Sequence, residues 1–320
     1  MSSPVALVIA FYNGAEEAVP CVESALANGV EPARVYLVDN STRAGEADLV
    51  MRRFPSITLV SAPPRVGYGR ACNLGARAAL QAGARHVILS NQDLVYAPDC
   101  VTQLVAALEE SPEVGIAAPV NYTWDFGGIE SFFVRQYLAA CPGLVADALQ
   151  GRLRPSYRVP RVMGSCMALR AEAIEAIGLF DELYFMYMED DDLCRRYGAA
   201  GWRMVLCPSA RVGHRHSHTA KGADEGMLCQ GRKSEAVFRL KDPVLPISSA
   251  VKRLVHRNLT DYASTLLRVR PGLLARFVRD DLAVLWMVRR ILAARRREQE
   301  VIRERGRKPR PVPPGAGGGA

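Results

Sequence analysis

Short, uninterrupted apolar runs alternate with helix-like segments through the first 120 residues, and this alternation constrains the fold more than any other feature. The runs of strand length are residues 5–11, 35–39, 57–60, 86–90 and 114–119. The helical segments between them are residues 15–27, 45–54, 69–82 and 98–110. Continuous apolar strands that alternate with helices are typical of parallel sheets covered on both faces. We therefore predict an α/β fold with a Rossmann-like, mostly parallel sheet.

The rest of the chain is patterned less regularly. Residues 121–160 are rich in aromatic residues, glycine and proline and predict a loop-rich excursion over the sheet edge, and residues 217–247 show little pattern. The later elements that we expect are a strand over 161–170, a helix over 171–177, strands over 202–207 and 210–214, and helices from about 249 to 305 with a break at Pro271.

Cysteine usage and the lack of long apolar stretches bear on where the chain works. Its eight cysteines are scattered without a C-x-x-C pair, which favours reduced, buried thiols over a disulfide framework or a zinc site. The first four residues do not resemble a signal peptide, and no run reaches the length of roughly 20 apolar residues that a spanning helix needs. We expect a cytoplasmic protein.

Polar residues follow the second and fourth expected strands. In open α/β sheets, ligands bind beyond the carboxyl ends of the strands. Asp39 ends the second strand, where it suits a hydrogen bond to a ribose or a base edge, or equally a turn. Asn91-Gln92-Asp93 follows the fourth strand. Its oxygens suit a hard divalent cation shared with phosphates, although for this motif alone a turn with a helix cap nearby is the favoured interpretation.

Two glycines open the third helix. The segment Gly67-Tyr-Gly69-Arg-Ala-Cys-Asn73 brings backbone N–H groups to a helix start, where they can approach a phosphate. The dinucleotide fingerprint requires such glycines directly after the first strand. An NAD(P)-binding enzyme is therefore a weak alternative.

The strongest local feature is the acidic run Glu189-Asp190-Asp191-Asp192, which follows the segment Phe185-Met-Tyr-Met188. Four adjacent carboxyl groups repel one another, so the run is either an acidic first helical turn or a site. A carboxylate against an aromatic wall can have its pKa raised into the range of a general base.

Histidines cluster at the end of the last expected strand, at His214, His216 and His218. Alternation along a strand places such side chains on one face, which suits a metal or phosphate site. Core or surface histidines are the alternative.

Taken in order, these motifs resemble family 2 inverting glycosyltransferases, and among them the rhamnosyltransferase-like branch. The resemblance covers about residues 5–216. The motifs that carry it are Tyr12-Asn13, Val38-Asp-Asn-Ser41, Gly67 to Asn73, Asn91-Gln92-Asp93, Gly164 to Arg170, Gly178 to Glu182, Phe185 to Arg195, Ala200-Gly-Trp202 and Ala210 to His214.

The resemblance implies a GT-A fold that binds a nucleotide-sugar donor. The residues that would bind the nucleotide and its diphosphate are Tyr12, Asp39, Gly67, Gly69, Asn73, Asn91 and Asp93. The domain would span residues 1–220, with a nucleotide-binding half over 1–120 and an acceptor and catalytic half over 121–220. A helical extension over 221–305 and a disordered Pro/Gly tail over 306–320 would follow.

The resemblance also assigns roles in the reaction. Asp93 and His214 would bind Mg²⁺ or Mn²⁺ at the donor diphosphate. Asp190 would be the general base, and Glu189 and Asp192 would hold the acceptor or orient that base. Asp190 would take the proton of an acceptor hydroxyl as it attacks the anomeric carbon.

The partners that the resemblance implies are a nucleotide-sugar donor and a glycan or polyprenyl-linked acceptor. dTDP-rhamnose is the leading donor, with UDP-sugars as the alternative. The family's usual Asp-x-Asp is Asn91-Gln92-Asp93 here, which should weaken metal binding. A catalytically impaired relative that serves as a binding subunit is therefore an alternative function.

The net charge of +8 is concentrated near the C-terminus. Residues 289–310 hold ten Lys and Arg but three Glu, so this window carries +7 and the rest of the chain is nearly neutral. That distribution disfavours nucleic-acid recognition by the fold. Apolar residues precede or interleave with the basic ones: Leu273, Phe277, Leu285, Trp286, Val288, Ile291 and Leu292. A basic helix with an apolar face suits peripheral contact with the inner face of the cytoplasmic membrane, or else packing on the domain.

Overall fold

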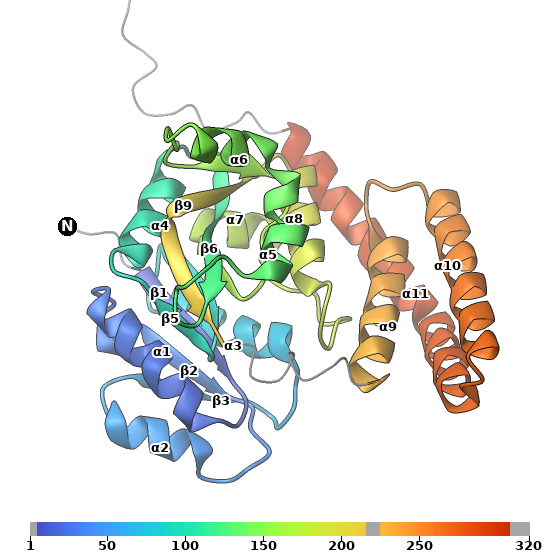
Figure 1. Cartoon of the computed structure of the whole chain (residues 1–320), viewed down its shortest axis with the longest axis horizontal. Helices are drawn as coiled ribbons and strands as arrows, with labels where there is room; N and C mark the ends of the chain where they lie inside the picture. Colours follow the sequence, from blue (N-terminus) through green and yellow to red (C-terminus); the bar gives the residue numbers. More distant parts are fainter. Residues whose placement is uncertain (1–4, 216–224, 308–320) are drawn as a thin grey trace, which may run out of the picture.

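The computed structural model describes residues 5–215 and 225–307, and a nine-stranded sheet forms its centre (Figure 1). The strands are β1 Val5–Phe11, β2 Val35–Asp39, β3 Thr58–Ser61, β4 His86–Asn91, β5 Leu94–Tyr96, β6 Val114–Thr123, β7 Tyr157–Val159, β8 Cys166–Arg170 and β9 Arg203–His214. Their order is β3-β2-β1-β4-β8-β6-β9-β5, and β7 pairs with β9.

Six of these strands run in one direction. Strands β3, β2, β1 and β4 are mutually parallel, and β6 and β9 have the same direction because β8 is antiparallel to both β4 and β6. The short strands β5 and β7 are antiparallel to β9. The prediction of a mostly parallel α/β sheet is confirmed.

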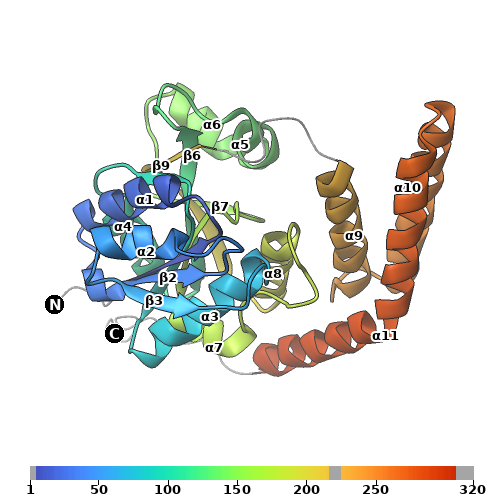
Figure 2. The ribbon, with the colours of Figure 1, turned by 90° about the horizontal axis from the view of Figure 1, so that it is seen from below.

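Helices cover both faces of the sheet (Figure 2). In the α/β part they are α1 Ala15–Ala27, α2 Glu46–Arg53, α3 Tyr68–Gln81, α4 Cys100–Glu109, α5 Ser131–Gln136, α6 Pro142–Leu149, α7 Ala171–Ile177 and α8 Glu189–Ala199, with short 3₁₀ turns at Pro32–Arg34 and Leu138–Ala140. In β1, Leu7 and Ile9 pack with α1, α2 and α4, whereas Ala6 and Val8 pack with α3. Burial on both faces explains why this strand is apolar throughout.

Three further helices lie beside the α/β part (Figure 1). They are α9 Glu225–Lys241, α10 Ile247–Leu267 and α11 Pro271–Arg307. They share a small apolar core with Tyr184, and α8 contacts both α9 and α11.

The structure corrects several expected elements. Residues 121–160 contain α5, α6 and β7 as well as loops, and the weakly patterned segment 217–247 contains α9. The two strands expected near residue 208 are one strand, β9, because a register shift against β6 accommodates Pro208. The strand expected from residue 161 begins only at Cys166. Residues 306 and 307 belong to α11, and the remainder of the expected tail lies outside the described residues.

Two further observations concern the described residues. All eight cysteines are free and buried. Within residues 5–215 and 225–307, no helix combines the length and apolar character needed to cross a membrane.

Candidate active site

The buried Gln92 side chain ties the end of β4 to the end of β1, and the Asn13 side chain ties the end of β1 to the end of β2. The Gln92 amide oxygen accepts a hydrogen bond from the Tyr12 backbone N–H at 2.7 Å, and its amide nitrogen donates to the Asn13 carbonyl at 2.5 Å. The Asn13 side chain in turn accepts from the backbone N–H of Thr42 at 3.2 Å. The Tyr12 side chain remains 38% exposed beside this junction. We predicted no separate role for Gln92 from the sequence, although it stands between Asn91 and Asp93.

Asp39 pairs in register with Phe11 at the ends of β2 and β1. Its Oδ1 accepts a hydrogen bond from the Ser41 backbone N–H at 2.9 Å. This is the turn interaction that the sequence left open as one alternative, and it does not occupy the second carboxylate oxygen. The nucleotide contact of Asp39 stays a prediction.

The start of α3 packs against the segment that precedes α8. Gly67 has φ +94°, and a Cβ at this position would lie 2.4 Å from the Phe185 carbonyl oxygen. A Cβ at Gly69 would lie 3.0 Å from the Cβ of Phe180. These glycines therefore permit close packing against residues 180–185.

Asn73 also helps to hold α3 against the segment of residues 180–185. Its amide nitrogen donates to the Phe180 carbonyl at 2.8 Å, and its amide oxygen accepts from the Phe180 N–H at 3.1 Å. The side chain is 3% exposed and both polar groups are occupied. These contacts give Asn73 a packing role, and its place in the nucleotide pocket stays a prediction.

Asp93 and His214 lie side by side, as the metal prediction requires. Strand β5 pairs with β9 so that Leu94 lies opposite His214. This register brings the Asp93 Oδ1 to 3.4 Å from the His214 Nε2. The Glu130 Oε2 lies 3.6 Å from the Nδ1 of the same ring. Burial by itself lowers the pKa of His214, but Asp93 and Glu130 together raise it to about 9.

The chemistry of these donors suits a divalent cation. Carboxylate oxygens and an imidazole nitrogen are ligands that Mn²⁺ accepts, and Mg²⁺ prefers the oxygens. Among the residues that the structure describes, no group of three or more His, Cys, Asp or Glu forms a self-sufficient metal site. Only the neutral His214 ring can be a ligand, so a cation would displace its proton; Asp93 and His214 would then fit a cation that completes its coordination with phosphate oxygens of a substrate. His216 and His218 lie outside the described residues.

Asn91, at the end of β4, is linked to the catalytic candidates through β8. Its backbone N–H donates to the Ser165 carbonyl at 2.8 Å. The neighbouring Gly164 N–H donates to the Asp190 Oδ2 at 2.9 Å. Two consecutive residues, Gly164 and Ser165, thus contact the Asp190 carboxylate and the end of β4. The Asn91 side chain itself is half-buried.

Asp190 has a perturbed pKa. Burial and the neighbouring Asp191 raise it to about 6, although the Gly164 N–H opposes that shift. Glu189 is more strongly affected, because burial and then the charge of Asp190 raise its pKa to about 8. Its Oε2 is buried and has no hydrogen-bond partner among the described residues. At neutral pH, Asp190 is therefore mostly ionised and Glu189 is mostly protonated. Two neighbouring carboxyl groups whose pKa values differ in this way can act as a base and as a hydrogen-bond donor.

The other two acids of the run face different partners. Asp191 forms an ion pair with Arg161 at 2.9 Å. The Arg161 guanidinium lies 5.0 Å from the centre of the Tyr137 ring. Glu130, Arg161 and Tyr137 all belong to or adjoin the region 121–160, whose irregular pattern offered no signal for them.

Asp192 lies away from the expected acceptor site. It is 1% exposed, and its oxygens accept hydrogen bonds from Arg196 at 2.8 Å, Lys241 at 2.7 Å and Tyr184 at 3.1 Å. Burial by itself raises the pKa of Asp192, but Lys241 and then Arg196 hold it below its usual value. Its carboxylate joins α8 to α9, so we do not retain it as an acceptor ligand.

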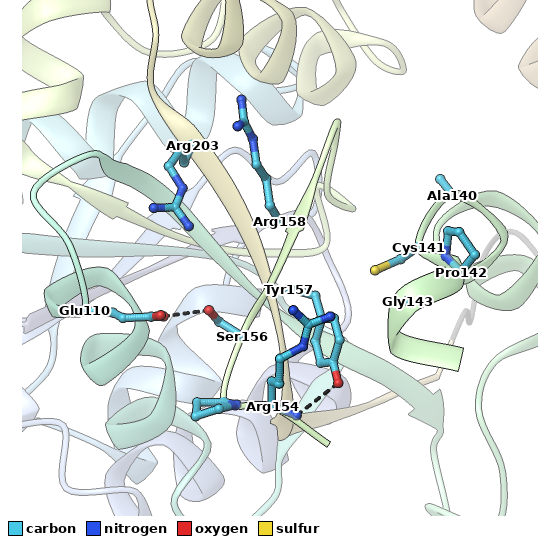
Figure 3. Close-up of a pocket in the computed structure, with 11 residues that line it drawn as sticks. Glu110, Ala140, Cys141, Pro142, Gly143, Arg154, Ser156, Tyr157, Arg158 and Arg203 are labelled. Atoms are coloured by element: carbon cyan, nitrogen blue, oxygen red, sulfur yellow. Dashed lines mark hydrogen bonds between the residues drawn. The ribbon is translucent and has the colours of Figure 1, made fainter. Parts of the chain in front are cut away.

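A cavity of about 470 Å³ lies elsewhere, between α6 and β7 (Figure 3). Arg154, Arg158 and Arg203 line it together with Glu110. Strand β7 pairs with the first half of β9, whereas His214 ends that strand. The cavity contains none of the predicted site residues.

Solved glycosyltransferases share this fold. A mannosyltransferase from Pyrobaculum calidifontis, solved with GDP-Man and Mn²⁺, aligns over 94% of this chain and 84% of its own with a TM-score of 0.55 and 16% identity. GalNAc-T7, solved with UDP, GalNAc and Mn²⁺, aligns over 76% of this chain with a TM-score of 0.52 and 15% identity. This chain spans about half of that protein, 51%. The fold is that of the GT-A glycosyltransferases.

Sequence comparison then defines the family. Residues 3–231 match the model of the family described as glycosyltransferase like family 2, and the chain belongs to this family. Two Mycobacterium tuberculosis sequences, from strains CDC 1551 and H37Rv, are each 33% identical over 231 residues, which are 65% of this chain and 74% of each relative. Both are named N-acetylglucosaminyl-diphospho-decaprenol L-rhamnosyltransferase. The predictions that the chain is a glycosyltransferase and that it resembles the rhamnosyltransferase-like branch are confirmed.

Proposed function

We propose that this enzyme transfers rhamnose, with inversion, from a nucleotide-linked donor to a saccharide carried on a lipid diphosphate. The observation that carries the proposal is the Asp190 carboxylate, which Gly164 orients and whose pKa is raised to about 6. The names of the mycobacterial relatives supply the sugar and the kind of acceptor. dTDP-rhamnose is our first choice of donor, and UDP-sugars are the alternative.

The side chains suit a single displacement. The acceptor hydroxyl loses its proton to Asp190 as its oxygen bonds to the anomeric carbon, and the nucleoside diphosphate leaves with the electrons of the old C–O bond. The Gly164 N–H keeps the Asp190 carboxylate in place during this transfer. Protonated Glu189 donates a hydrogen bond to the acceptor sugar.

Asp93 and His214 would hold Mg²⁺ or Mn²⁺, with Asn91 beside them. When bound, such a cation offsets the negative charge of the leaving diphosphate. The exposed Tyr12 ring stacks on the donor base, and Asp39 binds the ribose or base through the oxygen that Ser41 leaves unoccupied.

The proposal is tested by incubating the full chain with Mn²⁺, dTDP-rhamnose and a polyprenyl-diphosphate-linked N-acetylglucosamine in detergent. We expect a rhamnosylated lipid. UDP-glucose and UDP-galactose serve as competing donors, and turnover with either in place of dTDP-rhamnose would contradict the donor assignment. Failure to turn over or hydrolyse any donor would favour a binding subunit instead.

The metal assignment has its own test. EDTA should abolish transfer, and excess Mn²⁺ should restore it. His214→Ala should raise the Mn²⁺ concentration needed for half-maximal transfer, and it should also weaken Mn²⁺ binding measured by the paramagnetic relaxation of water protons in the presence of dTDP. Transfer that is indifferent to EDTA would contradict the roles of both Asp93 and His214.

A further inference from the structure

The turn between α10 and α11 exposes several large apolar side chains to water. We call residues Leu266–Pro271 the hairpin tip. Within it Leu266 is 61% exposed, Leu267 is 85% exposed and Val269 is 83% exposed. Three large aliphatic side chains within four residues therefore lack any apolar contact that would remove them from water.

The backbone of the hairpin tip makes Val269 still more unusual. The Val269 N–H donates to the Leu266 carbonyl at 3.0 Å and the Arg270 N–H donates to the Thr265 carbonyl at 3.1 Å. These two bonds form a Schellman helix end, whose left-handed position usually holds glycine. Val269 occupies that position with φ +51°. A β-branched residue is rare in this conformation, so neither burial nor backbone geometry accounts for a valine here.

The hairpin tip is also basic. Arg268 forms no ion pair with any described residue, whereas Arg270 and Arg276 both approach the same Glu225, each at 3.6 Å. Two arginines therefore share one carboxylate, and Arg268 adds a third positive charge. This excess of positive charge complements an anionic surface.

The hairpin tip lies at the same end of the C-terminal helices as the start of α9. Its contact with Glu225 places it beside the first residue of α9, and Figure 1 shows the start of α9 and the α10–α11 turn at the same end. Further along α9, the Ser234 hydroxyl donates to the Met186 carbonyl at 2.7 Å, in the segment that leads to Asp190. The middle of α9, rather than its start beside the hairpin tip, therefore contacts the segment before Asp190.

We propose that the hairpin tip inserts into the interface of an anionic lipid bilayer. Leu266, Leu267 and Val269 enter the boundary between headgroups and acyl chains, and Arg268 and Arg270 bind lipid phosphates. The proposal rests on the proposed function, because a lipid-linked acceptor is reached at a bilayer surface. It also relocates the membrane contact expected from the basic C-terminal segment. Leu273, Phe277 and Ile291 of α11 are buried, so much of the apolar face expected there points into the protein.

Flotation of the full chain with phosphatidylcholine vesicles, with and without phosphatidylglycerol, tests the hairpin tip. Leu267→Ser should lower binding to the anionic vesicles by at least about tenfold, because the free energy of burying one leucine side chain is lost. Arg268→Gln should lower it about fivefold on anionic vesicles and have little effect on neutral ones. Leu149→Ser is the matched control, because Leu149 is equally exposed at 85% but belongs to α6.

Val269→Gly separates lipid binding from structure. Glycine suits the left-handed position, so the thermal midpoint should stay the same or rise by about 1–3 °C. Vesicle binding should nevertheless fall. A variant that is at least as stable and binds lipid as well as the wild type would overturn the proposal.

Two other outcomes would also overturn it. One is loss of vesicle binding in Trp286→Ser but not in the hairpin-tip variants, which would assign the contact to α11, where Trp286 is 81% exposed. The other is a dimer of the wild type that Leu267→Ser dissociates, without vesicle binding. Flotation requires no donor, and transfer is assayed in detergent, so either proposal can fail while the other stands.

Discussion

Lys241 offers the sharpest test of how the C-terminal helices hold α8, the helix that begins with the acidic run. The side chain is completely buried, and its Nζ lies 2.7 Å from the Asp192 Oδ1 and 3.3 Å from the Asp181 Oδ2. It also donates to Glu298 of α11. Burial by itself lowers the pKa of Lys241, but Asp192, Glu298 and Asp181 together outweigh that effect and the pKa is raised. Lys241 is therefore charged at neutral pH and links α8, α9 and α11.

Lys241→Met keeps most of the side-chain volume and removes the charge. Asp192 and Glu298 would then share Arg196, which lies 2.8 Å and 3.5 Å from them, as their nearest cation. Breaking a buried ion pair on one side costs about 3–5 kcal/mol because a charge is left uncompensated. Since domains are commonly stable by only about 5–15 kcal/mol, we expect a large fraction of the unfolding free energy to be lost.

Equilibrium urea unfolding, followed by tryptophan fluorescence and circular dichroism, measures this loss. The matched control is Arg239→Met, because Arg239 pairs with Glu235 on the same helix while both side chains are about 30% exposed. That variant should cost about 0.2–1 kcal/mol. Adding Glu298→Gln to Lys241→Met should recover part of the loss, because one uncompensated carboxylate disappears. If Lys241→Met costs no more than Arg239→Met, the account of this network is wrong.

Two further predictions concern the active site. Asp190 must be ionised to accept a proton and its pKa is raised to about 6, so kcat/KM should be level above that pH and fall about tenfold per unit below it; a profile that stays level to pH 5 would exclude Asp190 as the base. Gly67→Ala should lower the thermal midpoint and the transfer rate, because its Cβ would meet the Phe185 carbonyl at 2.4 Å. Gly83→Ala is its control, since Gly83 has a similar φ of +79° but nothing within 4 Å, and equal losses in both variants would show that backbone strain alone is responsible.

The sheet could be predicted from sequence because each strand is marked by the apolar pattern of its own residues. Residues 5–11 are apolar without alternation since both faces of β1 are buried, and the strand has the predicted bounds. The bounds of α1 also agree, whereas α9 was missed. Helix α9 is buried along one side by partners such as α11, and polar residues interrupt its apolar pattern.

The candidate site was only partly predictable. Its acids and His214 stand at ends of strands or helices, where the sequence directs attention. The contact of Asp93 with His214 depends on β5, which has only three residues and too little pattern to predict. Lys241 lies 49 residues from Asp192, and nothing in the sequence around it indicates that it is buried beside a carboxylate.

The central claim is that Asp190 is the base of a glycosyl transfer, and the rate of Asp190→Asn tests it most directly. Asparagine keeps the size of the side chain and can still accept from the Gly164 N–H through its amide oxygen, but it cannot accept the acceptor's proton. We predict that kcat falls by at least about a hundredfold, the usual contribution of a general base. The dissociation constant of dTDP-rhamnose, measured by calorimetry with Mn²⁺, should stay within about twofold because Asp190 does not touch the nucleotide in this account. Full turnover by Asp190→Asn would contradict the account.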